Sequence, residues 1–224
     1  METPAPVAVP PAPETPAPGE PEIRIGLGTS LAGADIGGGA ALVVTDPTGA
    51  RLAVIPAGTI WRLERAGTGI GVSGPGGPSS TPAERIGIAG SVAGEPVRVN
   101  GRLYRGVVEV RRDTSGLTLV NRLGMEAYLQ GVVSAEMGRR SLGEREALRA
   151  QAVVSRTYAH RNLRRWAARG FDLYASVSDQ VYGGVLAETP EGIEAVGSTR
   201  GRILTYGGAP IDAFFYSTCG GRTA

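Results

Sequence analysis

Apolar and polar residues alternate along short segments in the first half of the chain. Three segments follow this pattern: residues 22–28, 41–55 and 97–120. Alternation with a period of two is typical of half-buried strands, and the Asn100-Gly101 pair between two such runs is a strong hairpin signal. Residues 67–83 are rich in Gly, Ser, Pro and Thr and predict a loop. The pattern therefore predicts strands and turns from residue 23 to residue 120.

The period of the pattern changes after Gly124. Residues 125–137 (MEAYLQGVVSAEM) predict a short helix that ends at Gly138, and residues 143–170 predict a longer one that ends at Gly170. In the longer helix the predicted buried stripe is Ala147, Ala150, Val154 and Tyr158. Strands return at residues 201–206 and 209–218. The predicted class is α+β, with two central helices packed on antiparallel strands.

The first 22 residues differ from the rest because Pro, Ala and Glu dominate them. Proline removes backbone donors and favours extended polyproline II, so this segment predicts a disordered tail. We expect three regions: the tail at residues 1–22, a strand-rich lead-in at residues 23–99, and a mixed domain at residues 100–224.

The chain has enough apolar residues to form a hydrophobic core, since 42% of the 224 residues are hydrophobic. All 23 basic residues are arginine and the net charge is +2, but nine arginines crowd residues 139–169. This crowding indicates either a solvated helix face or attraction to an anionic polymer or membrane surface. No basic-aromatic alternation supports a nucleic-acid partner.

Cys219 and His160 are the only residues of their types. A lone cysteine forms no internal disulfide, and two ligands do not make a structural zinc site, so we expect no metal and no cofactor. His160 is predicted at the surface. The chain has no apolar run long enough to span a membrane and no basic-then-apolar secretion signal at its N-terminus.

Glu136 is the residue with the strongest chemical signal, because it shares a helix face with Leu129 and Val133. Desolvation on an apolar face raises the pKa of a carboxyl group, and a general acid working near neutral pH requires a raised pKa. The alternative is a structural ion pair with Arg139 or Arg140 at the helix end. Residue types alone leave both interpretations open.

Residues 100–223 resemble the stage II sporulation protein D and LytB-type amidase-enhancer (SpoIID/LytB) family. The resemblance rests on several blocks in order: YRGVVEV, LTLVNRL, MEAYLQGVVSAEM, EALRAQAVVSRTYAHRN, DQVYGG and AVGSTRGRILTYGGAPIDAFFYSTCGGRT. The AQAVVSRTYA and STCGGRT blocks are the most specific. Residues 23–99 are similar to the variable, strand-rich lead-in of such proteins.

The resemblance implies bacterial cell-wall chemistry outside the cytoplasm, with a role in sporulation left open. Sporulation members are lytic transglycosylases that cut peptidoglycan glycan strands stripped of their stem peptides. Their essential glutamate matches Glu136. As substrate-binding candidates the resemblance adds Gln180, Tyr182, Ser217, Thr223 and Arg156.

That chemistry explains why one carboxylate would suffice. Most glycosidases need two carboxylates. A lytic transglycosylase uses the muramic acid C6 hydroxyl as an internal nucleophile, and the product is a 1,6-anhydro sugar. The alternative function is a non-catalytic, wall-binding enhancer of a partner amidase, which the LytB-type members suggest.

The sequence differs from the family pattern in two places, and each difference leads to an expectation. Some members bind zinc before the Gln-x-Tyr block, but residues 174–179 (YASVSD) contain neither His nor Cys. The family domain usually continues beyond the Gly-Gly-x-Thr block, whereas this chain ends at Ala224. We therefore expect a domain that is incomplete at its C-terminus and marginally stable in isolation.

Overall fold

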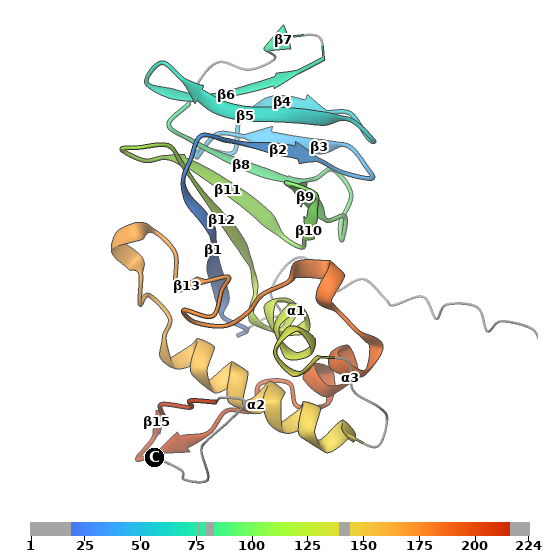
Figure 1. The fold of residues 1–224 in the computed structure, drawn as a ribbon, viewed down its shortest axis with the longest axis vertical. Coiled ribbons are helices and arrows are strands. Elements are labelled where there is room, and N and C mark those ends of the chain that lie inside the picture. Colours follow the sequence, from blue (N-terminus) through green and yellow to red (C-terminus); the bar gives the residue numbers. More distant parts are fainter. Residues whose placement is uncertain (1–18, 76, 79–82, 139–143, 216–224) are drawn as a thin grey trace, which may run out of the picture.

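The computed structural model describes residues 19–75, 77–78, 83–138 and 144–215. Two stacked layers of strands form one part of the molecule, and three helices with their connecting loops form the other (Figure 1). Strands β1 (Glu22–Leu31) and β12 (Leu117–Gly124) run from the layers of strands down to the helices. The α+β class, with a strand-rich part followed by helices, is confirmed.

The larger sheet has seven strands. Its spatial order is β13 (Leu173–Tyr174), β1 (Glu22–Leu31), β12 (Leu117–Gly124), β11 (Val107–Arg112), β8 (Arg85–Gly90), β3 (Leu42–Thr45) and β4 (Arg51–Ile55). All neighbours are antiparallel except β1 and β13, which are parallel.

The smaller sheet has six antiparallel strands. Its order is β10 (Arg102–Tyr104), β9 (Val97–Val99), β2 (Gly33–Gly37), β5 (Ile60–Ala66), β6 (Gly69–Gly74) and β7 (Gly77–Pro78). Buried aliphatic side chains of both sheets, such as Ile36 and Ile88, belong to one hydrophobic core. The predicted Asn100-Gly101 turn joins β9 to β10, and both residues have positive φ, as a tight hairpin turn requires.

The helices are α1 (Met125–Met137), α2 (Arg145–Arg161) and α3 (Pro190–Ser198), with 3₁₀ turns at η2 (Ala167–Arg169) and η3 (Gly184–Ala187). Helix α1 begins directly after β12 and contacts α2, α3 and η3. Because neighbours surround it, nine of its residues are buried, and Leu129 and Val133 are among them.

Three predictions about the loop at residues 67–83 and the longer helix were wrong in part. Residues 67–83 are not a loop throughout, because β6 pairs with β5 and buries Ile70 and Val72. Glycines alternate with Ile70 and Val72 in this segment, and in the sequence they indicate a loop rather than strand positions. Helix α2 ends at Arg161 rather than Gly170. Its buried stripe also differs, since Ala147 and Ala150 are exposed. The stripe is Leu148, Ala152, Ser155 and Ala159, joined by Tyr158.

The C-terminal strands are much shorter than predicted. Only β14 (Thr205–Tyr206) and β15 (Ala209–Pro210) pair, and residues 211–215 form no strand. Helix α3 was not predicted, although its sequence carried the signal. The Thr189 hydroxyl accepts a hydrogen bond from the Gly192 N–H as an N-cap, and Pro190 occupies the first turn.

The boundary predicted between residues 99 and 100 falls inside the β9–β10 hairpin. Strands from both sides of this boundary also pair within the larger sheet, where β11 joins β8 and β12 joins β1. The division therefore does not coincide with a break in the hydrogen bonding of the sheets.

Candidate active site

Glu136 lies in the last turn of α1, close to the point where Gly138 ends the helix with a φ of 68°. Its side chain is half-buried. The backbone N–H of Val181 donates a hydrogen bond of 2.6 Å to Oε1. This backbone donor holds the carboxyl group in one orientation, as a reacting group requires.

Burial raises the pKa of the Glu136 carboxyl above its ordinary value. The hydrogen bond from Val181 favours the charged form and opposes this shift, but desolvation is the larger effect. The carboxyl group therefore keeps its proton to a higher pH than an exposed glutamate does. This is the direction that proton donation near neutral pH requires.

An open cavity of about 330 Å³ lies beside Glu136. Its wall combines polar and apolar groups: Glu136, Tyr158, Arg165, Val177, Ser178, Asp179, Val181, Phe214 and Phe215. Val177 and Phe214 are 89% and 74% exposed, so large apolar side chains stand at its rim. Such a wall suits a ligand with both hydroxyl groups and apolar faces.

Asp179 is a second carboxylate of this cavity, and sequence reasoning missed it. Its side chain is fully buried. It accepts hydrogen bonds from the Tyr158 hydroxyl at 3.0 Å, the Trp166 indole at 3.0 Å and the Tyr174 backbone N–H at 2.8 Å. It also pairs with Arg165 at 3.1 Å. With its lone pairs occupied, Asp179 fixes Tyr158 and Arg165 in the cavity wall.

The two residues beside Val181 are anchored behind the cavity. Gln180 is fully buried and joins the Tyr128 hydroxyl at 3.2 Å to the Ser155 carbonyl at 3.3 Å. Tyr182 is 2% exposed, and its hydroxyl donates to Asn121 at 2.8 Å. These positions leave no surface for a substrate. We correct the prediction that both bind substrate and assign them the positioning of the Val181 N–H.

Gly131 permits this arrangement because the Tyr182 ring lies directly against α1. A Cβ atom at residue 131 would come within 2.6 Å of Cε2 of that ring. The Gly183 N–H also donates to the Gly131 carbonyl at 3.1 Å. The absence of a side chain at this position brings the loop that carries Val181 onto the helix that carries Glu136.

Arg156, also predicted to bind substrate, lies instead inside the helical part. Its guanidinium and the Glu126 carboxylate form two hydrogen bonds of 2.7 and 2.8 Å, and the two side chains are 2% and 8% exposed. The guanidinium also donates to the Val196 carbonyl at 3.2 Å. A buried arginine with these partners joins α1, α2 and α3, so we reassign it to structure.

Ser217, Thr223, Arg139 and Arg140 lie outside the described residues, so their predicted roles stay predictions. His160 is exposed. Within the described ranges, no group of three or more His, Cys, Asp or Glu side chains could hold a metal ion. In the same ranges, none of the helices is long and apolar enough to cross a membrane.

Comparison with known proteins finds a family model that matches the segment containing this site. The family model described as stage II sporulation protein (SpoIID) matches residues 113–206. Through this segment, the chain is similar to the SpoIID family. The matched residues include all three helices, Glu136 and the loop from Asp179 to Tyr182.

Curated relatives also match part of the chain. An uncharacterized protein of Brachyspira hyodysenteriae is 35% identical over 126 residues, which cover 56% of this chain and 34% of the relative. Stage II sporulation protein D of Bacillus subtilis is 36% identical over 119 residues, which cover 46% of this chain and 34% of the relative. The chain thus spans about a third of the length of these relatives. No solved structure matches it.

Proposed function

We propose that this chain contributes the catalytic site of a lytic transglycosylase that cleaves peptidoglycan glycan strands, with Glu136 as the catalytic acid. The observation that carries the proposal is a half-buried carboxyl group of raised pKa at an open cavity, on the helix matched by the SpoIID family. The glycan strands lie outside the cytoplasm, so the proposed site of action is extracytoplasmic. A role in sporulation is part of the same proposal.

In the proposed reaction, Glu136 first donates its proton to the glycosidic oxygen as the bond to the anomeric carbon breaks. The resulting carboxylate then takes the proton of the muramic acid C6 hydroxyl as that oxygen attacks the anomeric carbon. One sugar leaves with a free hydroxyl and the other carries a 1,6-anhydro ring, so no water is consumed. Glu136 ends the cycle protonated, as it began.

The state of Asp179 supports a mechanism with one reacting carboxylate. Its side chain is fully buried and its oxygens accept from Tyr158, Trp166 and the Tyr174 backbone. A carboxylate held in this way is poorly placed to attack a sugar or to activate water, as a second carboxylate does in most glycosidases. An internal hydroxyl nucleophile removes the need for that second group.

The rim of the cavity offers contacts for sugar rings. Phe214 presents an exposed aromatic face, which suits the apolar C–H face of a pyranose. Arg165 pairs with Asp179 but remains 41% exposed, so part of its guanidinium faces solvent at the cavity. We propose that these two side chains and Tyr158 orient the glycan.

The deciding experiment compares the wild-type chain with Glu136→Gln on amidase-treated cell wall, with mass analysis of the soluble products. We expect anhydro-sugar ends from the wild type and a loss of about 10²- to 10⁴-fold in the variant, the usual contribution of a general acid. Glu191→Gln, which neutralises a half-buried carboxylate outside the cavity, is the matched control. Equal product from Glu136→Gln would contradict the assignment.

The second candidate is a non-catalytic enhancer of a partner amidase, favoured by the exposed apolar side chains of Val177 and Phe214 at the cavity rim. Such side chains suit a partner surface as well as a sugar. The two functions separate in one assay of amidase turnover. Enhancement that survives Glu136→Gln, without anhydro products from the wild type, would support the enhancer.

A further inference from the structure

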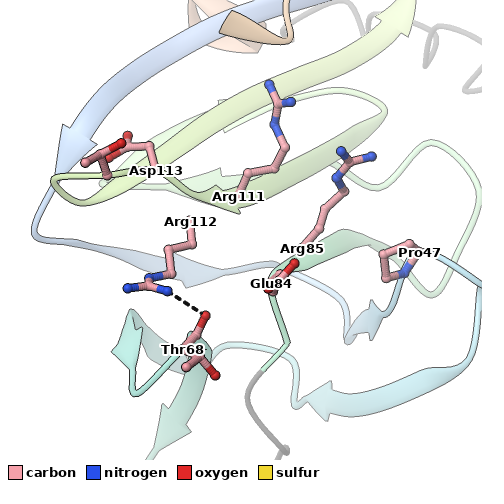
Figure 2. Close-up of a pocket in the computed structure, with 8 residues that line it drawn as sticks. Pro47, Thr68, Glu84, Arg85, Arg111, Arg112 and Asp113 are labelled. Carbon is pink, nitrogen blue, oxygen red and sulfur yellow. Dashed lines mark hydrogen bonds between the residues drawn. The ribbon is translucent and has the colours of Figure 1, made fainter.

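A second cavity, of about 760 Å³, lies at one end of the larger sheet, in the strand-rich part of the molecule (Figure 2). Eight residues line it: Pro47, Thr68, Glu84, Arg85, Arg111, Arg112, Asp113 and Thr114. We refer to this cavity as the arginine groove. None of its lining residues belongs to the cavity beside Glu136.

Arg85 and Arg111 stand directly opposite each other on the antiparallel strands β8 and β11. Their side chains extend in the same direction from the sheet, while Arg112 points the other way, toward Thr68 (Figure 2). Like charges directly opposite on neighbouring strands destabilise a sheet. The pair is therefore an unfavourable feature of the isolated fold.

Three nearby carboxylates do not neutralise this pair. Glu84 lines the groove but forms no ion pair with either arginine among the described residues. Asp113 accepts hydrogen bonds from the backbone N–H groups of Ser30, Ser115 and Gly116 and from the Thr118 hydroxyl, and these bonds lower its pKa to about 2. The Asp113 carboxylate thus stabilises the turn after β11 and does not pair with Arg85 or Arg111. Glu109, which lies two residues before Arg111 on the same strand face, is 2.8 Å from the Arg122 guanidinium.

The remaining contacts of the groove arginines are with neutral groups. Arg111 donates to the Arg169 carbonyl at 2.8 Å, and Arg112 donates to the Thr68 carbonyl at 2.9 Å. Among the described residues, neither of them nor Arg85 takes part in an ion pair. Desolvation lowers the pKa of Arg111, and the charge of Arg85 adds to this shift. An anion bound in the groove would offset the desolvation of Arg111 and the repulsion between Arg85 and Arg111.

We propose that the arginine groove binds phosphate groups of an anionic polymer between Arg85 and Arg111. A planar carboxylate is satisfied by the fork of one arginine, whereas a tetrahedral phosphate has enough oxygens to accept from two. The volume of the groove exceeds that of one phosphate, so it has room for neighbouring units of a chain. The site would hold the protein on a phosphate-rich surface polymer, independently of the chemistry at Glu136.

The test is a calorimetric titration of the chain with poly(glycerol phosphate) at low and high ionic strength. Inorganic phosphate and polyglutamate serve as comparison ligands. We expect the phosphate polymer to bind more tightly than either, and to bind more weakly as salt screens the charges. Binding to inorganic phosphate with equal affinity per phosphate group would reduce the site to a free-anion site and overturn the polymer assignment.

Arg85→Gln is the first variant, because Arg85 is exposed and takes part in no ion pair among the described residues. We expect about tenfold weaker polymer binding or more, as for the loss of one charge-assisted contact. The melting temperature without ligand should be unchanged or higher, since the repulsion with Arg111 is gone. Arg98→Gln removes the same charge from the exposed face of β9 and is the matched control. Equal weakening in both variants, or none in Arg85→Gln, would overturn the proposal.

Discussion

The strand-rich part and the helical part of this molecule bury different kinds of side chain. All ten buried polar or charged residues of the described structure lie between Thr118 and Thr199, and the described residues before Thr118 contribute none. Two of the ten, Thr118 and Asn121, lie on β12, and the other eight follow this strand. The sheets rely mainly on backbone ladders and aliphatic side chains, whereas the helices add side-chain networks to the shared hydrophobic core. The comparison teaches that the surroundings of Glu136 depend on a few specific polar contacts, while the sheets depend mainly on the alternation of apolar and polar residues along their strands.

The largest expected effect comes from breaking the polar network of the helical part. Arg156→Met leaves the Glu126 carboxylate buried without its partner, and such a loss typically costs about 3–5 kcal/mol of stability. Chemical denaturation should show a midpoint far below that of the wild type.

Arg98→Met provides the comparison in the strand-rich part, because Arg98 is exposed on β9. Its unfolding free energy should stay within about 0.5 kcal/mol of the wild type, as for most surface substitutions. Adding Glu126→Leu to Arg156→Met should recover part of the loss, since no buried charge then remains unpaired. Equal stability of Arg156→Met and Arg98→Met would remove the distinction between the two parts.

A smaller loss of stability is expected from Gly131→Ala, which adds a methyl group at residue 131. Alanine favours a helix by about 1 kcal/mol over glycine, but here its Cβ would meet the Tyr182 ring at 2.6 Å. Overpacking of this kind costs about 1–3 kcal/mol. We expect Gly131→Ala to destabilise the fold and to reduce activity as well, because the ring shares a loop with Val181.

Gly197→Ala is the matched control for that variant. Gly197 also lies in a helix, α3, but has no atom within 4 Å of the position that its Cβ would take. This substitution should stabilise the protein by about 0.5–1 kcal/mol. Thermal melts of the two variants should shift in opposite directions, and shifts of the same sign would contradict the packing argument.

The smallest effect concerns how the stability difference between the wild type and Glu136→Gln depends on pH. Its pKa is raised in the folded protein, so the folded state holds the proton more tightly than the unfolded state does. Stability relative to Glu136→Gln is therefore lost as the pH rises from the ordinary carboxyl value through the raised folded value. The wild type should match the variant in acid and fall below it near neutral pH. Melts that differ by the same amount at every pH would show that Glu136 carries no such shift.

The sequence by itself predicted the α+β class and most of the strands, because alternation and turn residues are local signals. It also singled out Glu136, which shares a helix face with apolar residues and whose catalytic role stays a prediction. The ordered motifs revealed the resemblance to the SpoIID family, which the family model supports. Helix α3 carried a readable signal, a Thr cap followed by Pro, that was overlooked. Ser217 and Thr223 stay predictions.

Tertiary structure alone decided which motif residues touch the cavity. Gln180, Tyr182 and Arg156 look like binding residues in a sequence, since polar side chains in a motif suggest contact with substrate. Their burial and partners come from elements 25 to 61 residues away, which no local pattern specifies. The opposition of Arg85 and Arg111 likewise depends on strand register. Pairing between distant segments determines the burial of the motif residues and the opposition of the two arginines. A side chain acquires its solvent exposure and its neighbours only when the chain packs.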